Sequence, residues 1–376
     1  MKRLFSVLAL VVLAACARPV SVKLLPASAF DTIVDGKTVS LYTIEGGGLT
    51  AQITNYGARV VSLWVPDRDG CLRDVVIGYG SIDAYLHNPG ERFLGSSPGP
   101  VANRIGGASF ELDSVTYELD RNDGENTLHG GFKGIDNLVW DVVEKNKNSI
   151  LMMVCHPDGL GGFPGNKTIS ARFTLTSDSA LKVEFEAVTD RPTPINLAHH
   201  SFFNLKGSGD GDILGHVITI NGSAITPVNE QLIPGDEVVS VNGTPFDFRK
   251  PHPIGERIEA DDLQLKFGRG YDHNWVIDMD GSSSLSLDAT VFDPVSGTFM
   301  EVWSDQPGLQ FYSGNFFGDG KTVDKYGNAI AFRGALALET QKFPDSIHHP
   351  QFPDTVLRPE ETYTHTCLYK FSVRKK

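Results

Sequence analysis

Beyond its first few positions the chain has no run of basic residues longer than the three that end it. Its 33 Lys and Arg are outnumbered by 46 Asp and Glu, which gives a formal net charge of −13 at pH 7. Proteins that bind nucleic acid use clustered Lys and Arg against the phosphates, so the composition argues against a nucleic-acid partner. The acidity is compatible with a neutral small-molecule ligand, although it does not select one.

Cysteine is also scarce, with 4 residues in a chain of 376. Cys16 lies in the N-terminal leader, and Cys71, Cys155 and Cys367 are widely separated, without any C-x-x-C spacing. An odd number of isolated cysteines provides neither a disulfide framework nor a zinc site. We expect the last three to be inert thiols in the core.

Motifs of metal and cofactor enzymes are missing too. The chain contains no H-E-x-x-H, Walker A or G-x-S-x-G motif, and GLGGFPG lacks the spacing of a dinucleotide-binding loop. The segment IHHP, residues 347–350, is more typical of a loop than of a set of metal ligands. The sequence therefore predicts neither a cofactor nor a metal site.

The N-terminus, by contrast, contains an export signal. Lys2 and Arg3 precede an apolar run over residues 4–13, and two alanines follow it. This run is too short for a permanent membrane span and has the charged start and small-residue end of a secretory signal. We expect a signal peptide over residues 1–15.

The residues around the cleavage site resemble the lipobox of bacterial lipoproteins, in which cleavage precedes a cysteine that then carries a lipid. In this chain that cysteine is Cys16; the alternative is an ordinary signal with an incidental cysteine. We expect a lipid anchor on Cys16, a tether over residues 16–29 and an exported protein facing the periplasm. Ala17 after the cysteine favours the outer membrane by analogy.

Strand signals dominate from about residue 30 onward. Short stretches rich in Val, Ile, Thr, Phe and Tyr alternate with turn segments such as PDRDG, RNDGEN and DPVSG. Only two short helices are expected, over residues 80–88 and 253–263. Because 40% of the residues are hydrophobic and no linker or repeat divides the chain, we predict one all-β domain over residues 30–376. Its expected architecture is a large antiparallel β-sandwich.

An apolar stretch near the C-terminus ends in a carboxylate. Residues 335–338 are Ala-Leu-Ala-Leu, and Glu339 follows directly. A run this apolar is usually buried, and burial of an ionised carboxylate is costly unless the group is paired or has a function. Glu339 is therefore either a solvated strand end or a general base whose pKa is raised toward neutrality by desolvation.

The segment INLAHHSFFNLKG contains a partner for such a base. His199 and His200 are adjacent, so in an extended chain they point to opposite sides, which argues against a joint metal site. One histidine suits the role of general acid because its unperturbed pKa lies near neutrality. The alternative is one buried, hydrogen-bonded histidine and one at the surface.

Other segments carry groups that suit a sugar. His129 precedes two glycines in NTLHGGFKG, Asn103 and Arg104 lie in ANRIGG, Asp272 lies in GYDHNW, and Gln310 lies in GLQFYSGN. Planar hydrogen-bonding groups beside aromatic faces are the mixture that a carbohydrate site needs.

Taken together, and in this order, these segments resemble the aldose 1-epimerase (galactose mutarotase) family. The resemblance covers almost the whole chain beyond the leader and is carried by NYGARVVSLWVPDRDG, VANRIGGASFELDSVTYELDRNDGENTLHGG, NLAHHSFFNL, FDFR, GYDHNWV, GLQFYSGNF and ALETQKFPDSIHHPQFPDTVLRPEETY. It implies a β-supersandwich with a sugar-binding cleft and no cofactor. The implied activity interconverts the α and β anomers of free aldohexoses such as glucose and galactose.

The resemblance also implies roles for individual residues. Glu339, in the ETQ motif, looks like the base that removes the anomeric hydroxyl proton, and His200 looks like the acid that protonates the ring oxygen. The remaining candidates look like substrate ligands: Asn103, Arg104, His129, Asp272 and Gln310. The implied partner is a monosaccharide, and no oligomeric state is indicated.

Two positions depart from the family pattern. Members commonly carry Gly-Arg ahead of the ANRI segment, where this chain has Gly99-Pro100, and usually have Asn before the catalytic histidine, where it has His199. Both positions are expected beside the cleft, so they bear on sugar preference more than on reaction type.

Other functions remain open at this point. A hexose-6-phosphate epimerase would need an added basic cluster for the phosphate, and none is evident. A lipid-anchored carbohydrate-binding protein would keep the cleft without turnover, but the retention of Glu339 and His200 argues against it. A glycoside hydrolase generally uses two carboxylates, whereas the expected pairing here is one carboxylate with one histidine.

Overall fold

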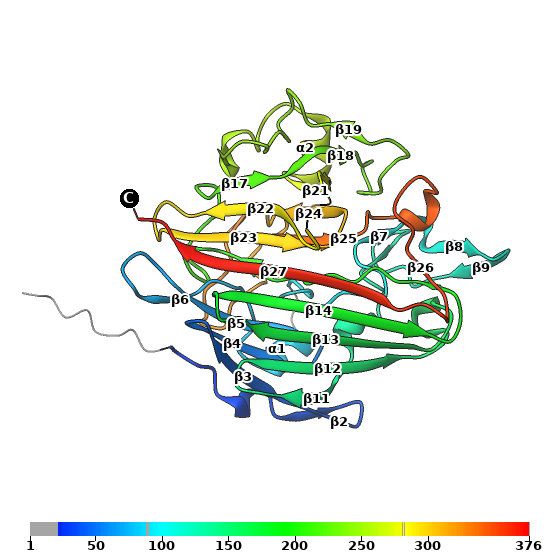
Figure 1. Cartoon of the computed structure of the whole chain (residues 1–376), viewed down its shortest axis with the longest axis horizontal. Helices are drawn as coiled ribbons and strands as arrows, with labels where there is room; N and C mark the ends of the chain where they lie inside the picture. The colour runs from blue at the N-terminus through cyan, green and yellow to red at the C-terminus, as the bar shows by residue number, and fades with distance from the viewer. Residues whose placement is uncertain (1–21, 88–89, 280, 282, 376) are drawn as a thin grey trace, which may run out of the picture.

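Figure 1 shows the computed structural model of the chain, which describes residues 22–87, 90–279, 281 and 283–375. The expected signal peptide and Cys16 lie outside the described residues. In the part that is described, no helix is long and apolar enough to cross a membrane.

The first β-layer is a nine-stranded antiparallel sheet, which runs across the front of the molecule in Figure 1. Along β13 and β14 buried residues alternate with half-buried or exposed ones, as expected for a sheet with one face on the core and one toward solvent. Its strands, in spatial order, are β11 (Asp141–Lys145), β12 (Ser149–His156), β13 (Lys167–Leu175), β14 (Ala180–Thr189), β27 (Tyr363–Val373), β23 (Thr298–Ser304), β22 (Ser286–Phe292), β17 (Val217–Ile220) and β20 (His252–Pro253).

The second layer consists of a six-stranded and a four-stranded antiparallel sheet, joined by a bridge between Val76 and Phe203. The six-stranded sheet has the order β16 (Phe202–Phe203), β25 (Leu336–Gln341), β24 (Gly308–Tyr312), β21 (Asp272–Ile277), β18 (Gly222–Thr226) and β19 (Val239–Ser240). The four-stranded sheet has the order β3 (Leu41–Gly46), β4 (Leu49–Thr54), β5 (Arg59–Pro66) and β6 (Leu72–Asp74).

The main hydrophobic core lies between these layers. One buried cluster contains Phe173 and Val302 of the nine-stranded sheet, Trp275 and Leu338 of the six-stranded sheet, and Ile53 of the four-stranded sheet. The predicted all-β antiparallel sandwich is therefore confirmed.

Short elements complete the fold. Four strand pairs are β1 (Thr32–Val34) with β2 (Lys37–Val39), β7 (Arg104–Ile105) with β10 (Thr127–Leu128), β8 (Ser109–Leu112) with β9 (Val115–Glu118), and β15 (Thr193–Pro194) with β26 (Val356–Leu357). Helix α1 (Ile82–His87) lies inside the first predicted helical segment. Helix α2 (Leu263–Gly268) begins where the second was expected to end, because Asp262 accepts hydrogen bonds from the first turn at Gln264 and Leu265.

Two further expectations need correction. Leu25 exchanges two hydrogen bonds with the side chain of Gln52, at 2.9 and 3.0 Å, and packs with Ala29 against the core. The folded part therefore begins before residue 30. Of the three cysteines expected in the core, Cys367 is buried, Cys71 is half-buried and Cys155 is exposed.

Candidate active site

One cleft brings together six of the seven predicted site residues. It lies on the face of the six-stranded sheet that points away from the main core, and it encloses about 480 Å³, part of it open to solvent. Small-molecule sites typically enclose ~300–1,000 Å³. The six predicted residues in its lining are Asn103, Arg104, His129, His200, Asp272 and Glu339.

Strand register places three of the predicted side chains on one face of this sheet. Glu339 in β25 pairs with Gln310 in β24, and Tyr312 in β24 pairs with Asp272 in β21. Directly paired residues, and residues two apart along a strand, point to the same face. The neighbouring positions, including Leu338, point into the main core instead. Strand β25 is thus apolar because it is buried on both faces, and its carboxylate faces the cleft.

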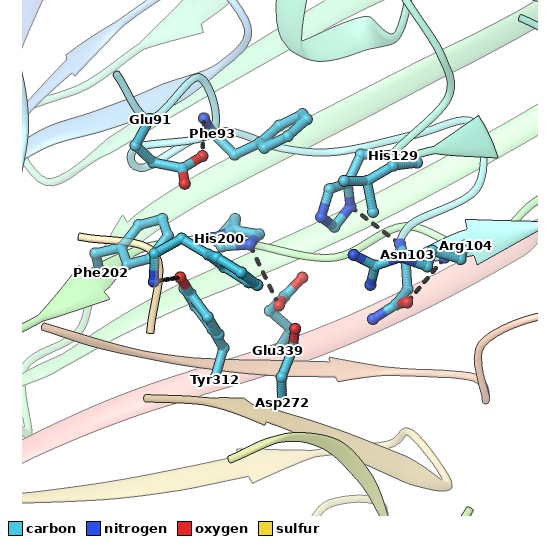
Figure 2. A pocket seen from close by; sticks show the side chains of 12 residues that line it. Glu91, Phe93, Asn103, Arg104, His129, His200, Phe202, Asp272, Tyr312 and Glu339 are labelled. Atoms are coloured by element: carbon cyan, nitrogen blue, oxygen red, sulfur yellow. Dashed lines mark hydrogen bonds and ion pairs between the residues drawn. The ribbon is translucent and has the colours of Figure 1, made fainter. Parts of the chain in front are cut away.

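Glu339 and His200 form a close pair of titratable groups in the cleft (Figure 2). The imidazole Nε2 of His200 lies 3.3 Å from the Oε1 atom of Glu339, and their side chains are only 6% and 2% exposed. Burial holds the pKa of Glu339 well above its usual value, with further repulsion from Asp272 and Glu91. Burial also lowers the pKa of His200 to about 3. Charge on either group alone is thus disfavoured.

The neighbouring histidine points away from the cleft. Nε2 of His199 lies 2.7 Å from the hydroxyl of Ser201, and its ring packs against the rings of Phe173 and Tyr369 in the core. The expectation that the two histidines face opposite sides is therefore correct. The expectation that His199 sits beside the cleft is wrong, because its ring belongs to the core.

His129 is held in one tautomer by the backbone. The N–H of Asn103 donates to Nδ1 of His129 at 3.0 Å, and burial keeps the pKa of His129 well below its usual value. A neutral imidazole whose Nδ1 accepts a hydrogen bond carries its proton on Nε2. Both residues have left-handed backbone conformations, with φ of 60° and 52°, which brings their backbones close together. His129 therefore offers a hydrogen-bond donor to the cleft.

The same contact bears on metal binding. Potential ligand atoms of His129, His200 and Glu339 all lie within 4.8 Å of one another. A metal ion at Nε2 of His129 would need the lone pair of an unprotonated nitrogen, but the bond from Asn103 places the proton there. This set of residues does not fit a metal ion in the geometry that the structure has.

Arg104 and Asp272 add charge to the lining. Nε of Arg104 donates to Asp123 at 2.7 Å, so the guanidinium is already paired with a carboxylate. Burial raises the pKa of Asp272, partly offset by Arg104 and by Gln310.

Gln310, the seventh predicted residue, lies behind the lining. Its amide Nε2 donates to Oδ1 of Asp272 at 2.7 Å, and the residue is only 3% exposed. In this structure Gln310 orients Asp272 and has no surface in the cleft.

The sequence reasoning missed other lining residues. Glu91 and Phe93 reach the cleft from a loop, and Phe202, Tyr312 and Phe316 add aromatic surface. The aromatic residues lie within segments that the sequence singled out, but the loop segment GERFLG has no recognisable pattern. The sequence reasoning therefore missed one carboxylate of the cleft, Glu91, which accompanies the predicted Asp272 and Glu339.

Comparison with known proteins identifies the family. The family model described as aldose 1-epimerase matches residues 40–370. The chain belongs to the aldose 1-epimerase family. It is 39% identical to galactose mutarotase of Bos taurus over 336 residues, which cover 89% of this chain and 95% of the relative. It is 35% identical to aldose 1-epimerase of Escherichia coli over 340 residues, covering 90% and 96%.

Solved structures agree with this assignment. An aldose epimerase homologue from C. elegans superposes with a TM-score of 0.82 at 26% identity, covering 90% of this chain and all of the other. Galactose 1-epimerase from Lactobacillus acidophilus gives a TM-score of 0.79 at 26% identity, covering 92% and 98%.

An arginine-carboxylate cluster supports one wall of the cleft. Arg92 donates twice to the buried carboxylate of Asp136, from Nε and Nη2 at 2.8 Å each, and Arg59 lies 3.5 Å from the same carboxylate. The guanidinium of Arg92 stacks on Phe93, whose ring contacts that of His129. Asp136 thus anchors one wall of the cleft.

Replacing this anchor should destabilise the protein. In the variant Asp136→Asn, the buried guanidinium of Arg59 loses its countercharge, so the free energy of unfolding should fall by about 3–5 kcal/mol. Urea unfolding measures the change. The matched control is Asp141→Asn, because Asp141 forms an exposed ion pair with Lys37 that contributes little. Equal stabilities of the two variants would contradict the assigned role.

Proposed function

We propose that this protein is an aldose 1-epimerase that interconverts the α and β anomers of free aldoses such as glucose and galactose. The observation that carries the proposal is the buried pair of Glu339 and His200, 3.3 Å apart in the wall of a cleft with polar and aromatic lining. Family membership supports it independently.

Ring opening needs one proton removed and one proton added. Glu339 as carboxylate takes the proton of O1, and the electron pair of that bond forms the C1=O double bond. The C1–O5 bond breaks, and O5 takes the proton of His200. Rotation about C1–C2 and reclosure, with the two roles reversed, deliver the other anomer.

The electrostatics of the pair favour this exchange. The form that opens the ring is the one with the proton on His200 and a charged Glu339. After ring opening Glu339 is protonated and His200 is neutral, which is the state that burial favours for both groups. Desolvation of the two side chains therefore favours ring opening. On closure the protons move back, so that His200 is protonated and Glu339 is charged again.

Other groups orient the sugar. His129 and Arg104 can donate to oxygens on which negative charge develops, and Asp272 can accept from hydroxyls. Every step moves protons and no electrons leave the sugar. We therefore propose that the reaction needs no cofactor.

The charge of the cleft disfavours a sugar phosphate as substrate. Three carboxylates line the cleft, and the guanidinium of Arg104 is paired with Asp123. A phosphate would need unpaired cations at this place.

Polarimetry tests the proposal. Freshly dissolved α-D-glucose or α-D-galactose should reach its equilibrium rotation faster with the protein, at a rate proportional to protein concentration. A carbohydrate-binding protein without turnover would leave the rate at its value in buffer.

We further propose that the protein is an exported lipoprotein anchored through Cys16 in the outer membrane. The variant Cys16→Ser should appear in the soluble fraction of fractionated cells, because it cannot accept the lipid. The matched control Cys71→Ser should stay with the membranes, as the unchanged protein does. A Cys16→Ser protein that remained fully membrane-bound would refute the anchor.

A further inference from the structure

The cleft is strongly acidic. Glu91, Asp272 and Glu339 line it, and among the described lining residues Arg104 is the one with a fixed positive charge. Nε of Arg104 lies 2.7 Å from Asp123, so its charge is already balanced. His129 and His200 are neutral when unpaired because burial lowers the pKa of both. A neutral aldose needs hydrogen-bonding partners but no such excess of carboxyl groups over cations.

Glu91 is the carboxylate that the reaction does not use. Its Oε1 accepts the N–H of Phe93 at 2.9 Å, and burial raises its pKa. Two guanidinium groups act on Glu91 from a distance, but that of Arg92 is bound to the carboxylate of Asp136, and that of Arg59 lies beside the same carboxylate and donates to backbone carbonyls. Among the described residues Glu91 therefore has no ion-pair partner of its own.

The position of Glu91 suggests which substituent of the sugar it would meet. Figure 2 shows its carboxyl group across the cleft from Asp272 and Glu339. Glu91 is close enough to Glu339 to raise the pKa of that carboxyl by repulsion. Glu339 contacts O1 in the proposed reaction, and the substituent on C2 is the neighbour of O1 on the ring.

We propose that the cleft accepts 2-amino-2-deoxy aldoses, whose ammonium group pairs with Glu91. This inference rests on the proposed function and names a substrate class for the same cleft. The ammonium supplies the countercharge that the buried carboxyl lacks, and a charge-assisted hydrogen bond forms away from water. Glu91 correspondingly rejects anionic aldoses such as uronates, because like charges in a buried site repel.

The test compares sugars within one protein. At a pH of about 6, below the ~8 of an ordinary amino group, glucosamine is cationic. For the unchanged protein and for Glu91→Gln, kcat/KM is measured by polarimetry with glucosamine, glucose, N-acetylglucosamine and glucuronate. Gln keeps the acceptor for Phe93 and removes only the charge. The ratio of kcat/KM for glucosamine to that for glucose should fall about 10- to 100-fold in the variant. The ratio of kcat/KM for glucuronate to that for glucose should rise in the variant.

The controls distinguish an effect of the charge of Glu91 from effects of bulk at C2 or of misfolding. N-acetylglucosamine has bulk at C2 without charge, so the ratio of its kcat/KM to that of glucose should change little. Glu360→Gln removes an exposed carboxylate far from any described contact and should leave every ratio unchanged. A general folding defect in Glu91→Gln would lower all rates together and leave the ratios intact. An unchanged glucosamine ratio alongside normal glucose turnover would overturn this inference alone.

A second measurement needs no variant. Glucosamine should compete with glucose in the unchanged protein at concentrations below the KM for glucose, and glucuronate should not compete. Competition by glucuronate as strong as that by glucosamine would overturn the inference. A protein inactive on all four sugars would refute the proposed function instead.

Discussion

The variant Glu339→Gln should lose about 10²- to 10⁴-fold in kcat for anomer interconversion while its fold stays intact. The amide has the size of the carboxyl group but cannot take the O1 proton, and a positioned general base contributes a factor of this order. KM should change little, because Gln still offers a hydrogen-bond acceptor to the sugar.

The expected stability of this variant follows from the surroundings of Glu339. Its Oε2 has no hydrogen-bond partner among the described residues, and burial opposes its ionised form. Replacing the carboxyl group with an uncharged amide therefore removes a buried group whose ionised form is disfavoured, and urea unfolding should give a free energy equal to or above that of the unchanged protein. Polarimetry on α-D-galactose measures the rate, with Glu360→Gln as the matched control. Near-normal turnover in Glu339→Gln would remove this residue from the reaction.

The sequence predicted the chemistry of the site better than its architecture. Glu339 could be recognised because an apolar run that ends in a carboxylate conflicts with simple burial. Adjacent histidines in an extended chain must diverge, which indicated that one of His199 and His200 faces the cleft, and the resemblance to the family implied that it is His200. Both signals are local, and the structure brings the two side chains to 3.3 Å.

Features that depend on distant parts of the chain could not be predicted from local patterns. Ala180 pairs with Lys370 where β14 meets β27, and no local pattern specifies that partner. The position of Gln310 behind Asp272 likewise follows from the register between β24 and β21. Glu91 reaches the cleft from a loop, and loop conformation leaves no period in the sequence.

The second large effect is expected for His200→Asn. The amide cannot deliver a proton to O5, so kcat should fall by about 10²- to 10⁴-fold, with a smaller change in KM. Polarimetry gives both parameters. His87→Asn is the matched control, because His87 is exposed on α1, away from the cleft lining.

The pH profile distinguishes loss of the acid from a mere distortion of the cleft. In the unchanged protein the active pair holds one proton. Raising the pH removes that proton and lowering it adds a second, so kcat/KM should follow a bell-shaped curve. In His200→Asn only Glu339 titrates, and its pKa lies above the usual value. Residual activity should then rise with pH through that pKa and stay level, without the alkaline decline. A variant that kept the alkaline decline would show that another group supplies the proton to O5.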